Sequence, residues 1–166
     1  MPAIINLLEN RSIDLLKPKP EDIFIEDIAG GLSKLCRFNG QIKDFYSVAQ
    51  HSCICVDLAR QSSIVDNKLL MAILLHDASE AYCGDVIKPL KNVIGKKYEF
   101  NEKRITRAIE KRFNVNIIDN KDTIKKFDVF IYNIEKKLKT NKDAIKCLSH
   151  SKAYRRFMKY FGELND

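Results

Sequence analysis

Apolar side chains recur at spacings of three and four residues over most of this chain. This spacing gathers them on one face of an α-helix, whereas a half-buried strand alternates apolar and polar residues. The pattern predicts an all-α fold with about six main helices. The expected helices span residues 27–38, 47–60, 66–82, 96–113, 122–139 and 149–161.

The N-terminal segment INLLENRSIDLL departs from the helical pattern. Two short apolar runs flank Asn10-Arg11, which indicates a small β-hairpin. The run Lys17-Pro18-Lys19-Pro20 then interrupts the chain, because proline fixes φ and has no amide hydrogen. The 166 residues contain no internal repeat and no Gly/Ser-rich linker, so we expect one domain from residue 1 to residue 166.

The composition, with 45% apolar and 31% charged residues, is that of an ordinary globular protein. No apolar run approaches the roughly 20 residues that span a bilayer, and the N-terminus does not resemble a signal peptide. We therefore expect a cytoplasmic protein. The cysteines lie mostly within apolar patterns, form no CxxC pair and are predicted to be reduced core thiols. They are Cys36, Cys53, Cys55, Cys83 and Cys147.

A formal charge of +7 suggests an anionic partner. Many of the lysines fall in the C-terminal half, where they alternate with acids at helical spacing as on a solvated helix face. The chain has no nucleic-acid-binding motif and no basic stripe with interleaved aromatic residues. The pattern argues against nucleic-acid binding, and a small anionic substrate accounts for the excess charge equally well.

Two of the predicted helices carry ionisable side chains on their apolar faces. His51 falls on the inward stripe of the second helix, so we expect it to point into the protein. In the stretch LLHDASEAYCGD, His76 and Glu80 share the buried face of the third helix, and Asp77 lies on the adjacent row. That helix buries a row of leucines and then places three ionisable groups where it continues inward.

The fifth predicted helix repeats the pattern, because Asp128 and Glu135 lie along the edge of its core stripe. A single buried histidine is more often a hydrogen-bonded core residue than a ligand, and a single acid usually lies at the rim or pairs with a base. Several such groups together require a cation, since burying unpaired carboxylates is costly and the chain places imidazoles beside them instead of arginines.

A divalent metal ion would satisfy these groups. Two histidines and two aspartates form a mixed nitrogen and oxygen donor set that suits zinc, manganese, iron, cobalt or nickel and leaves coordination positions open. Open positions are typical of a catalytic metal rather than a structural one. Such an ion lowers the pKa of its bound water and polarises a phosphoryl oxygen, so hydrolysis is the chemistry that we expect.

Three motifs, in this order along the chain, resemble the H…HD…D signature of the HD-domain metal-dependent phosphohydrolases. They are VAQHS with His51, LLHDASEAYCGD with His76 and Asp77, and KKFDVFIYNIEKKL with Asp128. The resemblance covers residues 25–138. It implies a single helical HD domain in which His51, His76, Asp77 and Asp128 hold one divalent metal ion. Magnesium joins the candidate ions named above.

Within that family the chain resembles the bacterial 5'-deoxynucleotidases and the phage dATP triphosphohydrolases. In the deoxynucleotidases an Arg and a following aromatic residue precede the first metal-binding His and contact the nucleotide, and Arg37-Phe38 stands at the matching place. The aromatic residue there is usually Trp, so Phe38 keeps a stacking face but loses the indole N–H. Glu80 matches the acid that positions or deprotonates the attacking water, and Asp85 matches a second active-site acid.

The chemistry of these residues supports such roles independently of the family. Glu80 lies one turn beyond the second histidine, within reach of a metal-bound water, although a surface acid near a helix end is the alternative. Arg37 offers a planar fork for phosphate, and Lys88 and Lys91 directly follow the metal motif. Both lysines could instead belong to a solvated loop, and Asp85 could simply cap the following turn.

We therefore predict a hydrolase in which metal-bound water attacks a phosphoryl group of a deoxynucleotide. The N-terminal resemblance favours a dATP or dNTP triphosphohydrolase, with 5'-deoxynucleotidase action on dNMPs as the alternative. A phosphodiesterase of cyclic or signalling nucleotides is a third enzyme possibility. The alternative of another class is an HD module that binds metal or nucleotide without catalysis.

Two further expectations concern stoichiometry and assembly. One metal ion is expected, because HD proteins with two metals typically bring extra histidines and only His150 remains outside the motifs. The family resemblance implies a homo-oligomer, a dimer or higher. The apolar C-terminal stretch AYRRFMKYFGEL either forms such an interface or closes the core.

Overall fold

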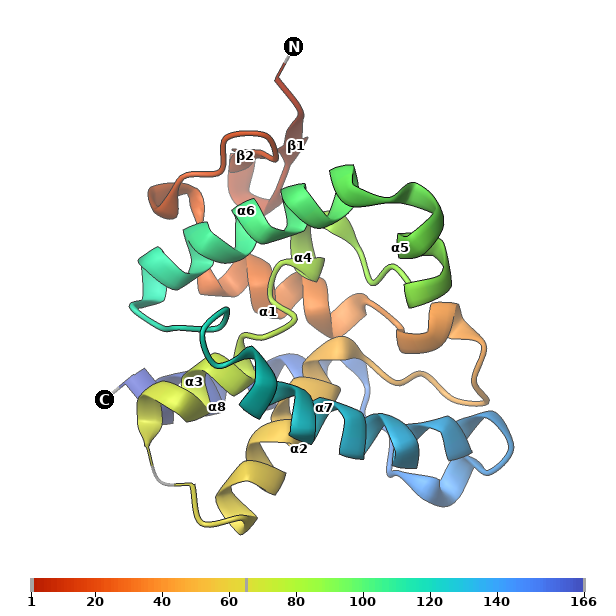
Figure 1. Cartoon of the computed structure of the whole chain (residues 1–166). Helices are drawn as coiled ribbons and strands as arrows, with labels where there is room; N and C mark the ends of the chain where they lie inside the picture. Colours follow the sequence, from red (N-terminus) through yellow and green to blue (C-terminus); the bar gives the residue numbers. More distant parts are fainter. Residues whose placement is uncertain (1, 65, 166) are drawn as a thin grey trace.

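The computed structural model describes residues 2–64 and 66–165, and this part of the chain is mostly helical (Figure 1). It contains eight α-helices and one two-stranded antiparallel sheet. The predicted all-α class with a small N-terminal hairpin is confirmed. The helices are α1 (Ile25–Lys34), α2 (Val48–Gln61), α3 (Asn67–Leu74), α4 (Glu80–Cys83), α5 (Lys88–Ile94), α6 (Lys96–Phe113), α7 (Lys121–Glu135) and α8 (His150–Asn165).

The hairpin pairs β1 (Ile4–Asn6) with β2 (Ser12–Asp14) in antiparallel register. Ile13 points from β2 into the core and is almost fully buried. Between the strands, the Arg11 guanidinium donates a hydrogen bond of 2.8 Å to the Asp27 carboxylate of α1. The hairpin is thus attached to the helical body both by apolar packing and by an ion pair.

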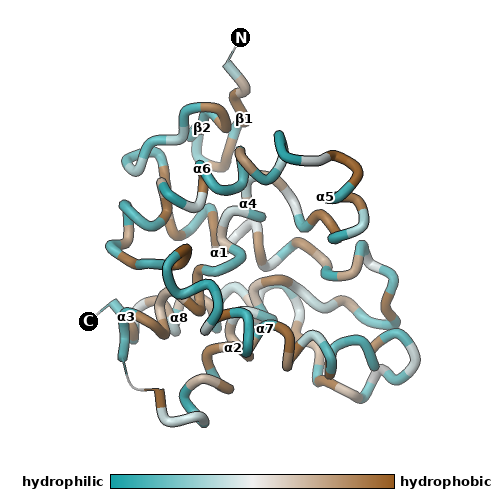
Figure 2. The backbone as a smooth tube through the Cα atoms, viewed as in Figure 1, coloured by the Kyte–Doolittle hydropathy of each residue, from teal (hydrophilic) through white to brown (hydrophobic). Residues whose placement is uncertain are grey.

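The core lies between α1, α2, α3 and α8, which pack against one another (Figure 1). Apolar and polar residues alternate along the long helices in Figure 2, as expected of helices that each bury one face. Phe157 and Leu164 of α8 are buried among residues of this core. Of the two roles considered for the C-terminal stretch, the structure therefore shows that it closes the core.

The third predicted helix, residues 66–82, is not continuous. α3 ends at Leu74, and the chain passes through turns at residues 75–79 before α4 begins at Glu80. His76 and Asp77 therefore lie in a turn between two helices, and their expected position inside one long helix is wrong.

A side-chain hydrogen bond explains this break. The Nδ1 atom of His76 lies 2.8 Å from the carbonyl oxygen of Ile73. In a continuing α-helix that carbonyl would accept from the amide of Asp77, four residues further on. The backbone tightens instead, and the amide of Ala78 donates to the carbonyl of Leu75, only three residues back.

The first predicted helix also ends earlier than expected. α1 stops at Lys34 and not at residue 38, and the amide of Arg37 donates to the carbonyl of Tyr46 (2.9 Å). Phe38 has a φ of 57°, in the left-handed region, which a right-handed helix excludes. Arg37 and Phe38 thus belong to a short 3-10 turn, residues 37–40, which lies between α1 and α2.

Side-chain caps and a glycine mark the ends of the helices at the site. The Ser47 hydroxyl accepts from the amide of Gln50 at the start of α2, and the Asp66 carboxylate accepts from the amide of Lys68 at the start of α3. Gly84 follows α4 with a φ of 80°, which favours glycine. The short α5 helix lies outside the predicted helices; it buries no residue, and its apolar side chains Leu90, Val93 and Ile94 are exposed.

The structure agrees with the sequence analysis on the state of the cysteines. All five cysteines are free thiols, and Cys53 and Cys55 are buried in the core, as predicted. Within residues 2–64 and 66–165, no helix combines the length and apolar character that crossing a membrane requires.

Candidate metal centre

The structure brings together four side chains from three segments that are distant in the sequence. His51 comes from α2, His76 and Asp77 from the turn after α3, and Asp128 from α7. The Nε2 atom of His51 lies 3.3 Å from Nε2 of His76 and 3.3 Å from Oδ1 of Asp128. The Oδ2 atom of Asp77 lies 3.2 Å from Nε2 of His76 and 3.7 Å from Nε2 of His51. We call these four residues the His/Asp cluster.

Hydrogen bonds on the far side of each imidazole fix its orientation. The Nδ1 atom of His76 faces the carbonyl of Ile73, which can only accept, so Nδ1 carries the proton. The Nδ1 atom of His51 lies 2.6 Å from the carboxylate of Glu135 and donates to it in the same way. In a neutral imidazole the opposite nitrogen then presents a lone pair, so both Nε2 atoms turn ligand lone pairs toward the centre of the cluster.

The carboxylates govern the charge at this centre. Burial alone lowers the pKa of His76, but Asp77 raises that pKa to about 9. Burial also lowers the pKa of His51, yet its neighbours, among them Glu135 and Asp128, hold that pKa well above its ordinary value. Burial raises the pKa of Asp77, but the imidazoles outweigh burial and bring it far below its usual range. The centre therefore favours a positive charge, which either a proton or a metal cation can supply.

The spacing of the cluster fits one small cation. Nitrogen and oxygen ligands lie about 2.0–2.2 Å from Zn²⁺ and similar ions, which places two ligands of one ion roughly 3–3.6 Å apart. The separations of 3.2–3.7 Å among the cluster atoms are of this size. The donor set and its spacing thus both suit a metal ion.

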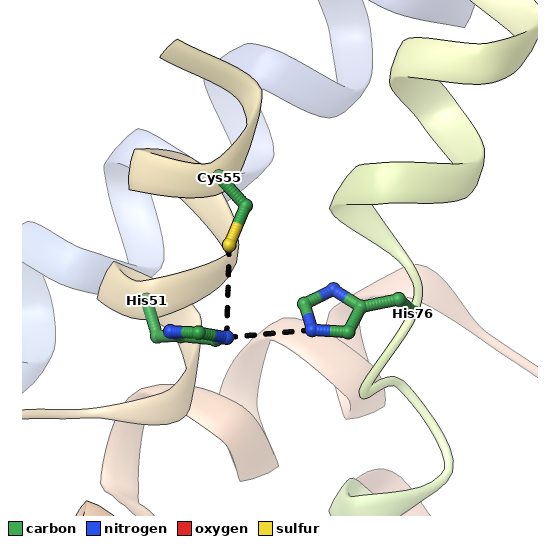
Figure 3. Close-up of side chains that lie close together, drawn as sticks. All are labelled: His51, Cys55 and His76. Atoms are coloured by element: carbon green, nitrogen blue, oxygen red, sulfur yellow. Dashed lines mark hydrogen bonds between the residues drawn. The ribbon is translucent and has the colours of Figure 1, made fainter. Parts of the chain in front are cut away.

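A thiol also faces this centre. The Sγ atom of Cys55 lies 3.7 Å from Nε2 of His51, one turn further along α2 (Figure 3). Together with His76, these residues form a group whose donor atoms all lie within 4.8 Å of one another and that could hold a metal ion. The sequence predicted Cys55 as a core thiol on the same inward stripe as His51, but it did not single out the thiol as a ligand.

Glu135 organises the inner side of the cluster. Its side chain is fully buried and accepts from Nδ1 of His51, from the hydroxyl of Tyr46 (2.7 Å) and from the guanidinium of Arg37 (3.1–3.2 Å). Burial raises the pKa of Glu135, but His51 and then Arg37 lower it overall, so Glu135 is held as a carboxylate. The sequence indicated only that Glu135 edges a core stripe.

We expect the substitution Glu135→Ala to lower the free energy of unfolding of the metal-free protein by about 3–5 kcal/mol. The carboxylate is buried against Arg37, His51 and Tyr46, and its removal leaves a guanidinium without its closest partner. Urea unfolding followed by circular dichroism measures this loss.

The matched control is Glu163→Ala, which breaks an exposed pair with Arg60. Exposed pairs contribute at most about 1 kcal/mol, so this variant should unfold close to the wild-type midpoint. Equal losses in the two variants would contradict the role assigned to Glu135.

Arg37 is engaged with acids in this structure. Besides Glu135, it contacts Oδ2 of Asp77 at 3.5 Å, and its side chain is mostly buried. Phe38 stacks on Tyr132 of α7, with ring centroids 5.6 Å apart and an interplanar angle of 21°. Arg37 therefore lies beside the cluster, where its guanidinium already binds two carboxylates, whereas Phe38 contacts Tyr132, which covers one face of its ring.

A cavity of about 690 Å³ opens beside His76 and Asp77. Glu80 lines it and is buried, yet its Oε2 atom has no hydrogen-bond partner among the described residues. Burial, followed by Asp77 and Asp85, raises the pKa of Glu80 well above its ordinary value. A buried carboxyl oxygen without a partner is costly, so the contacts among the described residues do not explain the position of Glu80.

Of the other predicted residues, the two lysines line this cavity, whereas Asp85 is not among its lining residues. Lys88 and Lys91 line it, but Lys91 is paired with Glu102 at 2.7 Å. Asp85 is half-buried between α4 and α5, where burial raises its pKa. Further lining lysines, which the sequence did not single out because they lie on α6 and α7, are Lys103 and Lys121.

Comparison with known proteins gives relatives but no family. An uncharacterized protein of Rhodobacter capsulatus is 46% identical over 112 residues, which cover 66% of this chain and 57% of that protein. The uncharacterized protein YfdR of Escherichia coli is 39% identical over 99 residues, which cover 60% of this chain and 52% of that protein. The matched regions thus span little more than half the length of these relatives. No model of a known protein family matches the chain.

Proposed function

We propose that this protein is an HD-domain phosphohydrolase that cleaves the phosphate or polyphosphate of a deoxynucleotide with the help of one divalent metal ion. The convergence of two imidazoles and two carboxylates from three separate segments carries this proposal. The order of these residues along the chain, H…HD…D, supports the same assignment.

His51, His76, Asp77 and Asp128 would hold the ion, which is zinc, cobalt, manganese, nickel, iron or magnesium. When bound, such an ion supplies Lewis acidity, which polarises a phosphoryl oxygen and makes water acidic enough to act as a nucleophile near neutral pH. Four protein donors also leave room in the coordination shell of a six-coordinate ion, as a catalytic site requires.

Glu80 is the group that we assign to proton transfer. Its carboxyl lines the cavity beside His76 and Asp77, and Oε2 has no partner among the described residues. A raised pKa lets the carboxylate accept a proton from the attacking water more readily and return it to the leaving group. Asp85, whose pKa is also raised, is the second acid on this side of the cluster.

The surroundings of the cluster suit an anionic substrate. Lys88, Lys103 and Lys121 line the cavity from three different helices, and the protein carries an excess of positive charge. Lysines attract phosphate groups as point charges, and Arg37 adds a bidentate donor if substrate phosphate replaces one of its acidic partners. Phe38, which stacks on Tyr132, offers its ring as a contact for the base or sugar.

The proposed substrate is dATP or another dNTP, with a dNMP as the alternative. The test is to incubate the protein with dNTPs and dNMPs in the presence of manganese, cobalt or zinc and to identify the products. Triphosphate and deoxynucleoside are expected from a dNTP, whereas orthophosphate and deoxynucleoside from a dNMP would indicate the deoxynucleotidase. Protein stripped of metal with a chelator is the control and should be inactive.

The same experiment separates catalysis from binding. A non-catalytic HD module would show nucleotide-dependent or metal-dependent stabilisation against heat without any product, since a ligand that binds only the folded state raises its melting temperature. Stabilisation without turnover of any nucleotide would therefore contradict the proposed hydrolase and favour a sensor.

A further inference from the structure

Cys55 occupies a position that packing alone does not explain. It lies four residues after His51 on α2, so the two side chains share one face of the helix. Its Sγ atom points at Nε2 of His51, the same atom that faces His76 (Figure 3). The carboxylate of Asp128 also lies close to this Nε2 atom. The thiol therefore lies at the edge between the apolar core, of which Cys55 is a buried member, and the centre of the His/Asp cluster.

Cys53 provides a comparison within the same helix. It is also buried, but two residues of α-helix separate it from Cys55 by more than half a turn, so it faces the other side of α2. The group of donor atoms within 4.8 Å of one another includes Cys55 with His51 and His76, and it does not include Cys53. Of these two buried thiols, only one lies where an ion held by the histidines would reach it.

We propose that Cys55 is a ligand of the metal ion together with His51 and His76 and that it makes this centre selective for zinc-like ions over magnesium and manganese. The inference rests on the metal centre of the proposed function, but it does not depend on which nucleotide is cleaved. The thiol ligates as thiolate, so its proton passes to solvent when the ion binds.

Donor softness gives the physical reason for the selectivity. Thiolate is a soft ligand that favours zinc, cobalt and similar ions, whereas magnesium and manganese favour carboxylate, carbonyl and water oxygens. Two imidazoles and one thiol form a group of donors, and the carboxylates of Asp77 and Asp128 both face Nε2 of His51. Without Cys55, the remaining nitrogen and oxygen donors would discriminate less between the two groups of ions.

Cobalt(II) spectroscopy tests the ligand directly and needs no substrate. Titration of the metal-free protein with Co²⁺ should give a sulfur-to-cobalt charge-transfer band in the near ultraviolet together with visible d–d bands. In Cys55→Ser and Cys55→Ala the charge-transfer band should disappear while d–d bands persist from the other donors. Cys53→Ser, the matched control, should keep both. Absence of the charge-transfer band from the wild-type protein that shows d–d bands would overturn the proposal.

A competition experiment measures the selectivity. Cys55→Ser should weaken Zn²⁺ binding by at least about tenfold, whereas Mn²⁺ binding should change by less than about threefold. Thermal melting of the metal-free variants, followed by circular dichroism, tests whether they are folded. If Cys55→Ser is not folded, Cys55→Ala takes its place. If Cys55→Ser weakened the binding of Zn²⁺ and Mn²⁺ equally, the proposed selectivity would be wrong. No nucleotide is present in either experiment. A negative result would therefore exclude Cys55 as a ligand without contradicting the proposed hydrolase activity.

Discussion

Asp77→Ala is expected to abolish both tight metal binding and nucleotide hydrolysis, with turnover falling by at least about 10³-fold. Asp77 contributes a carboxylate to the centre of the cluster, where it contacts both histidines and Arg37. Its removal takes away one donor and leaves Arg37 beside the imidazoles, and the positive guanidinium then repels a cation. Isothermal titration with Zn²⁺ or Mn²⁺ and product release from the preferred nucleotide measure the two losses.

Asp44→Asn is the control for this variant, since Asp44 is exposed and lies outside the cluster and its cavity. It should bind metal and turn over like the wild-type protein. Retained turnover in Asp77→Ala after removal of metal would contradict metal-dependent hydrolysis at this cluster.

The helical framework could be predicted because each long helix carries its own evidence. An apolar stripe at spacings of three and four is a local signal, and it located α2, α6 and α7 closely. The break after Leu74 could not be read in this way, because the leucine row continues past it. It depends on a hydrogen bond from the His76 side chain to the Ile73 carbonyl, and apolar periodicity does not register such a bond.

The contribution of Glu135 to the site lies in contacts that are remote in the sequence. Its carboxylate meets His51, Tyr46 and Arg37, which precede it by 84, 89 and 98 residues. Along its own helix it is one acid at the edge of an apolar stripe, which is the ordinary environment of a rim residue. Cys55 was obscured for a related reason, since a buried cysteine on an inward face is first read as packing. The motif residues could be found because a known signature singles them out, whereas the residues that support them could not.

Glu80→Gln is expected to separate metal binding from catalysis. Glutamine has nearly the same shape as glutamate but cannot accept the proton of the attacking water, so turnover should fall by about 10²–10⁴-fold. Metal content should remain near the wild-type value, because Glu80 lies beside the cluster and is not one of its four residues. The metal-free variant should unfold at the wild-type urea concentration or above it, since a neutral amide costs less to bury than a carboxylate without a partner.

The measurements are kcat with the preferred nucleotide, metal per chain by elemental analysis, and urea unfolding. Glu99→Gln is the matched control, because Glu99 lines the same cavity but is exposed on α6, and it should keep most of the activity. If Glu80→Gln turned over at the wild-type rate, the assignment of Glu80 to proton transfer would be wrong. Loss of metal together with turnover would instead make Glu80 a ligand, because a proton-transfer residue changes the rate and leaves the ion in place.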